Sequence, residues 1–166
     1  MSSFHRTDWL SLAQSVTATV AVIAAFAVAR YQHWLEQQSK RADERKMLVL
    51  LRDFIYAAYC AARDVDAYRS NRENVETQRT RVAQMRDLAQ RLEALNSIQV
   101  AALPNADSVR HLVRARNEVS NAIPLIAAPV DAADMRCGEP YGQRWRPFVG
   151  ALREAYESVR DIADRH

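Results

Sequence analysis

The sequence predicts an all-α protein, in which one N-terminal transmembrane helix continues as a long stalk into a three- to four-helix antiparallel bundle. Three observations predict this architecture. Helix-forming residues dominate, and the 166 residues include only three glycines and five prolines. An uncharged apolar stretch lies near the N-terminus, and later segments place apolar residues at helical spacing. Runs of alternating β-branched residues, which would indicate strands, do not occur in the sequence.

Residues 9–31 form the predicted transmembrane helix. No charged residue occurs between Trp9 and Ala29. About 20 mostly apolar residues in helical form cross the roughly 30 Å hydrocarbon core of a bilayer. Two alternatives stay open for this segment. Ala27-Val28-Ala29 fits the small-x-small rule of a cleavable signal peptide, and a buried helix of a water-soluble protein is the other interpretation.

Basic and aromatic residues flank this segment and set its predicted orientation. Lysine and arginine favour the cytoplasmic side, and five of them lie in residues 30–46, against Arg6 on the other side. The sequence thus predicts a short extracytoplasmic N-terminus (residues 1–8) and a cytoplasmic C-terminal domain at the inner membrane. The predicted membrane-interface anchors are Trp9, Tyr31, Trp34, Arg30, Lys40, Arg41, Arg45 and Lys46.

Small residues recur at every fourth position along one side of the predicted span. We call them the small-residue stripe: Ala13, Thr17, Ala21, Ala25 and Ala29. A pattern of this kind lets the backbones of two membrane helices approach closely. It predicts association with a second copy of the chain or with another membrane protein. The alternative is that the stripe only reflects the abundance of alanine.

Residues 32–46 are predicted to form a polar helical stalk, and residues 47–166 the cytoplasmic bundle. An apolar face begins at Met47, and a second helix is expected from about Glu73 to Gln99. A third helix should start near Asn105 or Asp107, either of which can cap it, and Pro124 should kink or end it. A final helix is predicted to open with Pro147, since proline suits the first helical turn.

Charge and motifs argue against several functional classes. The net charge is +3, and basic and acidic residues alternate along nearly every segment. No dense basic surface results, which makes nucleic acid a poor candidate partner. Phosphate-binding glycine loops and hydrolase or metalloprotease motifs do not occur, and the two cysteines lack metal-ligand spacing. We therefore assign no catalytic, cofactor-binding or metal-binding residue, and we expect no cofactor. Cys60 is expected to be buried among apolar residues, and Cys137 to lie in a loop.

One short segment combines aromatic and basic residues and is the candidate recognition patch: Tyr141, Arg144, Trp145 and Arg146. Aromatic and arginine side chains together can bind a lipid headgroup, a nucleic acid or a protein partner. In the alternative interpretation, Trp145 packs over the start of the last helix as a hydrophobic staple. The sequence favours this packing role.

These observations lead to one functional prediction and several alternatives. The protein is predicted to be a non-enzymatic, single-pass, membrane-anchored helical bundle. It would act as an accessory or scaffold subunit through self-association or through binding to a membrane-protein partner. The lipid bilayer is also a predicted partner. One alternative is a membrane-anchored sensor or effector that binds a small ligand in the bundle. The others are a spanin-like lysis protein with the domain in the periplasm and, ranked last, an enzyme.

Overall fold

The computed structural model describes residues 6–127 and 135–165. Within these ranges, the side chains of residues 6–16, 18, 19, 135, 139 and 140 lie outside the described part. The chain divides into two compact units, Met1–Ala42 and Asp43–His166. The division falls close to the position at which the sequence places the end of the stalk and the start of the bundle.

The first unit contains the N-terminal part of helix α1, which spans Arg6–Ser70. Apolar side chains along this part are exposed, among them Val20, Ile23 and Phe26. Among the residues whose side chains the structure describes, no helical segment combines the length and the apolar character needed to cross a membrane. Trp9 and Ala13, which belong to the predicted span, lie outside the described side chains.

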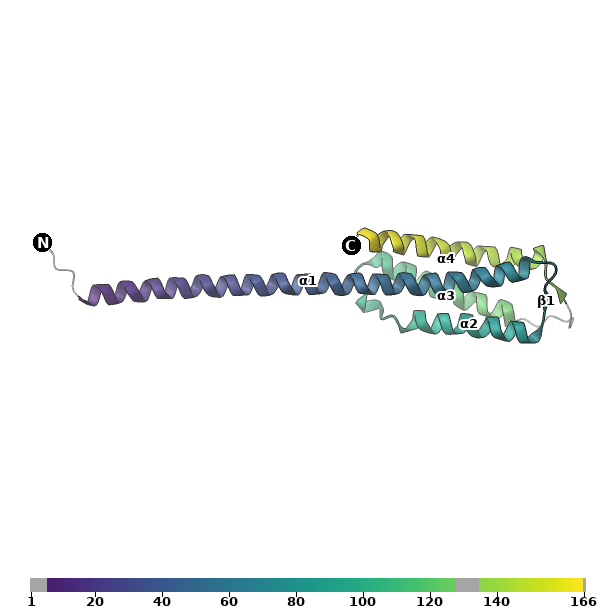
Figure 1. Ribbon diagram of the computed structural model, residues 1–166, viewed down its shortest axis with the longest axis horizontal. Helices are drawn as coiled ribbons and strands as arrows, with labels where there is room; N and C mark the ends of the chain where they lie inside the picture. Colours follow the sequence, from purple (N-terminus) through teal and green to yellow (C-terminus); the bar gives the residue numbers. More distant parts are fainter. Residues whose placement is uncertain (1–5, 128–134, 166) are drawn as a thin grey trace. The chain divides into compact units, whose positions relative to one another are not determined.

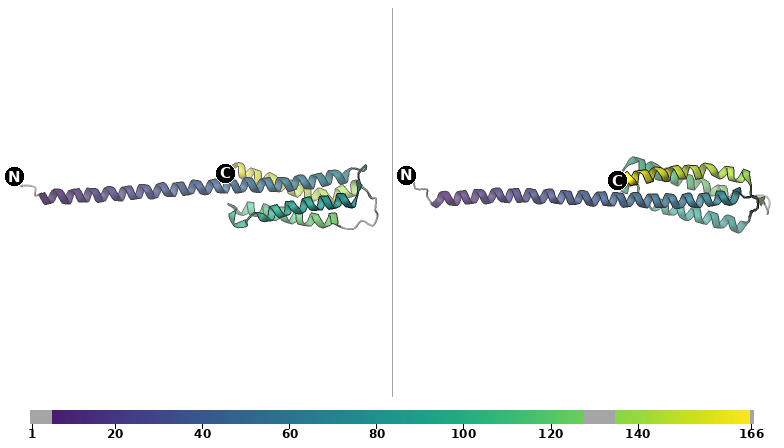
Figure 2. Two further views of the ribbon diagram at one scale, coloured as in Figure 1. Left: turned by 60° about the horizontal axis from the view of Figure 1, so that its bottom comes forward. Right: turned by 45° about the horizontal axis from the view of Figure 1, so that its top comes forward.

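The second unit is a four-helix bundle, as predicted. It consists of residues 43–70 of α1 together with α2 (Gln78–Ser97), α3 (Ala106–Ala127) and α4 (Glu139–Arg165). Successive helices run in opposite directions, and α3 packs against both α2 and α4 (Figures 1 and 2). A short 3₁₀ helix, η1 (Val100–Ala102), lies between α2 and α3. Short connections of this kind are typical of antiparallel bundles.

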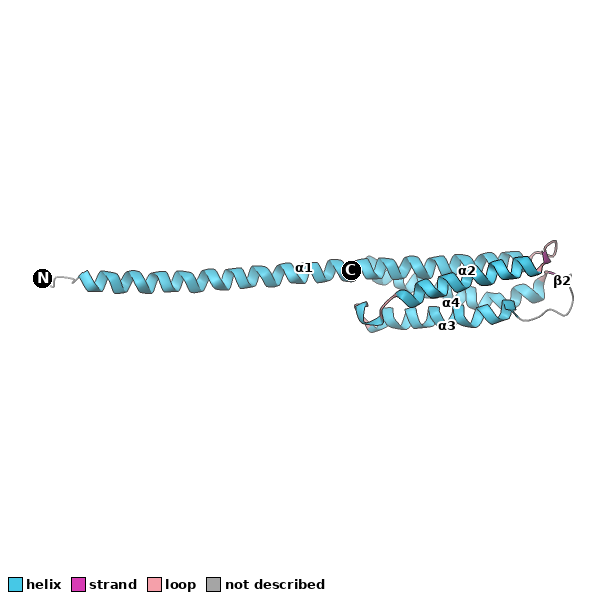
Figure 3. Cartoon of the chain, turned by 90° about the horizontal axis from the view of Figure 1, so that it is seen from below, coloured by secondary structure: helices cyan, strands magenta, loops and turns pink. Residues whose placement is uncertain are grey.

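Two short strands pair at the end of the bundle where α1 ends (Figure 3). Strand β1 (Val75–Glu76) runs antiparallel to β2 (Met135–Arg136), with Val75 opposite Arg136 and Glu76 opposite Met135. The sequence prediction contained no strand. Two residues are too few to produce a recognisable alternation, so this pairing depends on tertiary structure rather than on local pattern.

The bundle buries one continuous apolar core. The predicted face of α1 is confirmed, because Leu51, Ile55 and their helical neighbours are buried in this core. Most apolar residues that the sequence places at helical spacing in the later helices also face this core, but Val82, Ala89 and Val113 are exposed. Fully buried residues of the core include Leu51, Ile55, Ala58, Ala62, Leu88, Leu95, Leu112, Ala115, Val119, Ile126, Trp145, Ala155 and Val159.

Side-chain caps fix where two helices begin. Helix α2 begins at Gln78, not near Glu73 as predicted, because Thr77 caps it and accepts a hydrogen bond from the Thr80 backbone N–H at 3.2 Å. The prediction that Asn105 can cap the third helix is confirmed. Its Oδ1 atom accepts hydrogen bonds from the backbone N–H and the hydroxyl of Ser108, both at 2.7 Å.

Pro124, expected to kink or end the third helix, and Pro147, expected to open the last one, both lie inside helices. Helix α3 continues beyond Pro124 to Ala127, and α4 begins at Glu139, well before Pro147. The prediction that α4 opens with Pro147 is therefore wrong. Pro140 occupies the first turn of α4 instead, where the lack of a backbone N–H does no harm. Burial of Trp145 then holds the first turns of α4 on the core.

Candidate functional site

A group of polar side chains is buried at the end of the bundle where β1 and β2 pair. We call Arg69, Glu76, Cys137 and Trp145 the buried cluster. They come from the last turn of α1, from β1, from the segment between β2 and α4, and from α4. Their relative exposures are 4%, 3%, 3% and 0%. Charged side chains are almost never buried to this degree unless they are paired.

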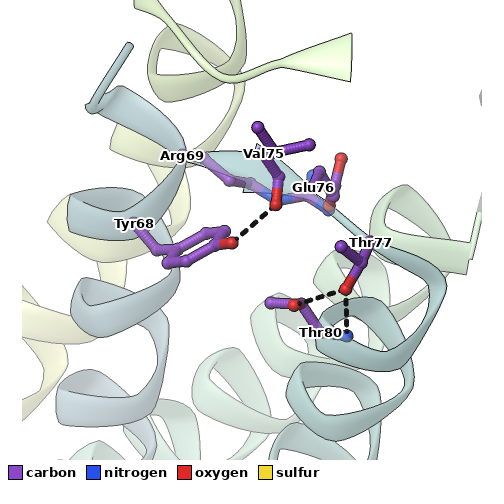
Figure 4. A network of polar contacts seen from close by, with 6 residues as sticks. All are labelled: Tyr68, Arg69, Val75, Glu76, Thr77 and Thr80. Atoms are coloured by element: carbon purple, nitrogen blue, oxygen red, sulfur yellow. Dashed lines mark hydrogen bonds and ion pairs between the residues drawn. The ribbon is translucent and has the colours of Figure 1, made fainter. Parts of the chain in front are cut away.

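The charges of the buried cluster form an ion pair. The Arg69 Nη2 group donates a hydrogen bond to Glu76 Oε1, and both residues are drawn in Figure 4. The guanidinium carbon of Arg69 also lies 5.2 Å from the centroid of the Trp145 ring, a cation–π arrangement. Burial lowers the pKa of Arg69, and the neighbouring carboxylate of Glu76 raises it. The pair thus offsets part of the desolvation cost of its own burial.

Hydrogen bonds to the backbone hold the surrounding segments together. The Tyr68 hydroxyl donates to the carbonyl of Val75 at 2.8 Å (Figure 4), and Asn74 Nδ2 donates to the carbonyl of Tyr68 at 2.8 Å. Next to the strand pair, the backbone N–H of Cys137 donates to the backbone carbonyl of Asn74 at 3.0 Å, and that of Gly138 donates to the backbone carbonyl of Arg69 at 2.9 Å. These bonds join residues 68–76 to residues 137–138, far apart in sequence.

Helices α1 and α4 approach closely beside this cluster. A Cβ atom placed on Gly142 would lie 2.2 Å from Ser70 Oγ and 3.2 Å from Ser70 Cβ. Only glycine therefore fits at this position without a shift of its neighbour. Gly142 brings the start of α4 against the end of α1, and this contact helps to close the cluster.

Three buried polar atoms of the cluster have no hydrogen-bond partner among the described residues: Arg69 Nε, Glu76 Oε2 and Trp145 Nε1. Each such atom costs about 1–3 kcal/mol, because its hydrogen bonds to water are lost and not replaced. Burial also raises the pKa of the Cys137 thiol, and the Glu76 carboxylate raises it further, while Arg69 lowers it. The closed cluster thus holds an unreactive thiol beside polar groups that are incompletely satisfied.

The structure separates the residues of the candidate recognition patch. Trp145 is fully buried, and its ring centroid lies 6.0 Å from that of Phe148. It packs on the core, but from within α4 rather than as a staple before the start of the helix. Arg144 and Arg146 are exposed, whereas Tyr141 is half-buried. No local sequence pattern marks Arg69 and Glu76, because only the fold brings them together in a buried pair. The residue types alone carry no signal of that burial.

The membrane-related residues that the structure describes lie on exposed surface of α1. Rings of the predicted anchors Tyr31 and Trp34 stack with centroids 6.1 Å apart, and the basic anchors are exposed. Lys46 forms an ion pair with Asp43 at 3.3 Å. Four residues of the small-residue stripe are exposed, Thr17, Ala21, Ala25 and Ala29, while the fifth, Ala13, lies outside the described side chains.

Neither a metal-binding group among the described residues nor a similar known protein points to a function. Over the described ranges, no group of three or more His, Cys, Asp or Glu residues could hold a metal ion. Cys60 is half-buried rather than buried, and Cys137 lies in a loop as expected. No protein-family model, no curated protein and no solved structure matches the chain.

Proposed function

We propose that the protein is a single-pass, membrane-anchored helical bundle, with residues 9–31 as the anchor and the bundle on the cytoplasmic side of the inner membrane. One observation carries this proposal. Residues 20–29 contain no charged residue, and every one of their side chains is exposed. Ile23 and Phe26 are 63% and 77% exposed. Apolar surface of this kind is unfavourable in water, at about 25 cal/mol per Å².

The exposed apolar residues point to all sides of the helix. Successive helical residues are rotated by about 100° around the axis. Val20, Val22, Ile23, Phe26 and Val28, together with the exposed alanines between them, therefore cover the whole circumference rather than one stripe. A surface helix of a globular protein is apolar on one face only, whereas a helix that is apolar all round belongs in a protein core or in lipid. Apolar side chains on every side of the helix therefore favour burial in lipid over packing against a single partner helix.

The residues after the apolar segment suit a membrane interface. Tyr31 and Trp34 stack on each other just after Arg30, and aromatic belts of this kind mark the boundary between lipid and water. The exposed basic residues that follow support the cytoplasmic placement of the bundle and can contact anionic lipid at about 1 kcal/mol each. The predicted anchor of 23 residues has a helical length of roughly 35 Å, enough for a bilayer core.

The proposed role is that of a non-enzymatic accessory or scaffold subunit. The small-residue stripe supports association within the membrane, because close helix packing replaces the hydrophobic effect there. The exposed Ala21, Ala25 and Ala29 leave room for such an approach. The bundle would then be held at the membrane surface next to a second copy or a partner protein.

Membrane anchoring is tested by fractionation of the full-length protein. Ile23→Lys combined with Phe26→Lys should release it from the membrane fraction, because a lysine at the centre of a span costs about 2.5–3.5 kcal/mol. Val82→Lys combined with Val113→Lys is the matched control, since both valines are exposed on the bundle, at 53% and 42%. The control should stay with the membrane. Equal behaviour of the two double variants would contradict the proposal.

Orientation is tested by reporters fused after His166. The proposal predicts that a reporter that works only in the cytoplasm is active and that one that works only in the periplasm is silent. The opposite result would place the bundle in the periplasm and favour the spanin-like alternative.

Association is tested in nanodiscs by measuring the oligomeric state. Ala21→Leu with Ala25→Leu should weaken self-association, because the larger side chains keep the helix backbones apart. The matched control, Val20→Leu with Val28→Leu, changes exposed apolar residues outside the small-residue stripe and should have no effect. A wild-type protein that is strictly monomeric would contradict self-association and leave a heterologous membrane partner as the proposed contact.

A further inference from the structure

We propose that the buried cluster fastens a clasp that opens without unfolding of the bundle, and that this opening exposes the Cys137 thiol. The clasp consists of residues 68–77 and 136–138, which the strand pair and the loop hydrogen bonds hold together. This device is separate from the membrane role proposed above, because every residue of the clasp belongs to the second unit.

The clasp lies outside the apolar core. The core cluster takes none of its described residues from positions 69–77 or 136–138. Two strands of two residues each and a few backbone hydrogen bonds secure these segments. Regions with few buried apolar contacts open at lower free energy than the core of the same domain. Opening of the clasp therefore involves only the last turn of α1 and leaves the rest of the helix packing intact.

Opening also relieves a cost of the closed state. Arg69 Nε, Glu76 Oε2 and Trp145 Nε1 are buried without partners in the described structure, and water can satisfy them once the clasp opens. Arg69 and Glu76 regain their hydration at the same time, which compensates for the loss of their contact. The closed and the open arrangement are thus closer in free energy than the folded and unfolded bundle.

Cys137 reports on this equilibrium. Cys137 is 3% exposed when the clasp is closed, and its backbone N–H donates to the backbone carbonyl of Asn74 beside the strand pair. A reagent in solution therefore reaches the sulfur only after the clasp opens. The rate of thiol modification measures how often the clasp opens, as long as closing is faster than the reaction.

The test uses the full-length chain in mild detergent with Cys60→Ser, so that Cys137 is the one remaining thiol. The probe is dithiobis(nitrobenzoate), whose disulfide is attacked by the Cys137 thiolate. A mixed disulfide forms, and one coloured thionitrobenzoate leaves. Local opening predicts a labelling rate whose urea dependence is much weaker than the m-value of global unfolding. A rate that follows global unfolding with its full urea dependence would overturn the proposal.

Variants of the ion pair give a second, independent readout. Glu76→Gln leaves a buried, unpaired guanidinium and should accelerate labelling by about 100-fold. Glu73→Gln is the matched control, an exposed glutamate in the same connection, and should change the rate by less than about twofold. Arg69→Met with Glu76→Leu should slow labelling, because apolar residues of similar volume need no desolvation of charge.

The labelling rates of these variants distinguish an ion pair that holds a locally opening clasp from one that only stabilises the whole bundle. A Glu76→Gln chain that labels at the rate of Glu73→Gln would overturn the proposal. A Glu76→Gln chain that unfolds altogether would show that the pair holds the whole bundle together rather than a clasp, and would overturn it as well. Slower labelling in the apolar double variant, with an unchanged midpoint of global unfolding, would support it.

Discussion

The same apolar residue types are exposed in one unit of the chain and buried in the other. In the first unit, Ile23 is 63% exposed, and apolar side chains surround the helix on every side. In the bundle, Ile55 is fully buried, and apolar residues lie on one face of each helix. Residue type alone therefore does not decide the role of a side chain. The surroundings of a side chain decide its role. Matched substitutions of one residue type at a buried and an exposed position therefore measure how much those surroundings contribute to stability.

The largest expected difference is between two isoleucines. Ile55→Ala should lower the free energy of unfolding of the bundle by about 2–5 kcal/mol, because it removes buried methyl groups and leaves a cavity. Ile23→Ala should leave the stability of the bundle unchanged, since its side chain is exposed in the other unit. Urea unfolding followed by circular dichroism measures both. Equal losses would mean that the two units share one core.

Two arginines give the next largest contrast. Arg116 is half-buried and donates hydrogen bonds to carbonyls at the end of α2, from Nη2 to Leu95 at 2.9 Å and to Ile98 at 2.7 Å. Arg116→Met should cost about 2–3 kcal/mol, because these helix-end carbonyls lose a charged donor. Arg110 forms only an exposed ion pair with Asp107, so Arg110→Met should cost less than about 1 kcal/mol. A larger loss of unfolding free energy for Arg110→Met than for Arg116→Met in the same assay would contradict this account.

Two glycines of α4 should respond with opposite signs. Gly142→Ala places a methyl group against Ser70 and should destabilise the bundle by about 1–3 kcal/mol. Nothing lies within 4 Å of the corresponding position at Gly150, so Gly150→Ala should stabilise by about 0.5–1 kcal/mol through helix propensity. Neither glycine has a positive φ angle, so steric contact alone separates them. Thermal unfolding should show shifts of the midpoint in opposite directions.

The smallest effect concerns pH. Burial lowers the pKa of His111 below its ordinary value of 6.5, with a smaller contribution from Arg114. Between the lowered pKa and 6.5 the unfolded chain binds more protons than the folded one, so stability falls as the pH drops through this window. His111→Gln should remove up to one proton from the pH dependence of unfolding. Identical pH profiles for the wild type and His111→Gln would exclude this role.

Local sequence patterns were sufficient to predict the bundle and several of its details. The spacing of apolar residues identified the core face of α1, and Asn105 was recognised as a cap because its side chain acts on the next turn. The packing role of Trp145 was also anticipated. These features depend on residues within a few positions of each other.

Features that depend on distant residues were missed. The Arg69–Glu76 pair and the β1–β2 pairing need the loops at one end of the bundle to meet. Proline suits the first turn of a helix, so the local sequence predicts a helix start at Pro147, but burial of Trp145 keeps the preceding turns helical and Pro147 inside α4. In each case a tertiary contact overrides a local preference.

The central claim is that the apolar residues of the two units serve different partners, lipid for the first and the bundle core for the second. The most direct test compares the full chain with residues 43–166 expressed alone. The account predicts that the shorter chain is water-soluble and unfolds cooperatively at nearly the same urea midpoint as the full chain, while the full chain floats with lipid vesicles. A shorter chain that also floats, or that fails to fold, would contradict it.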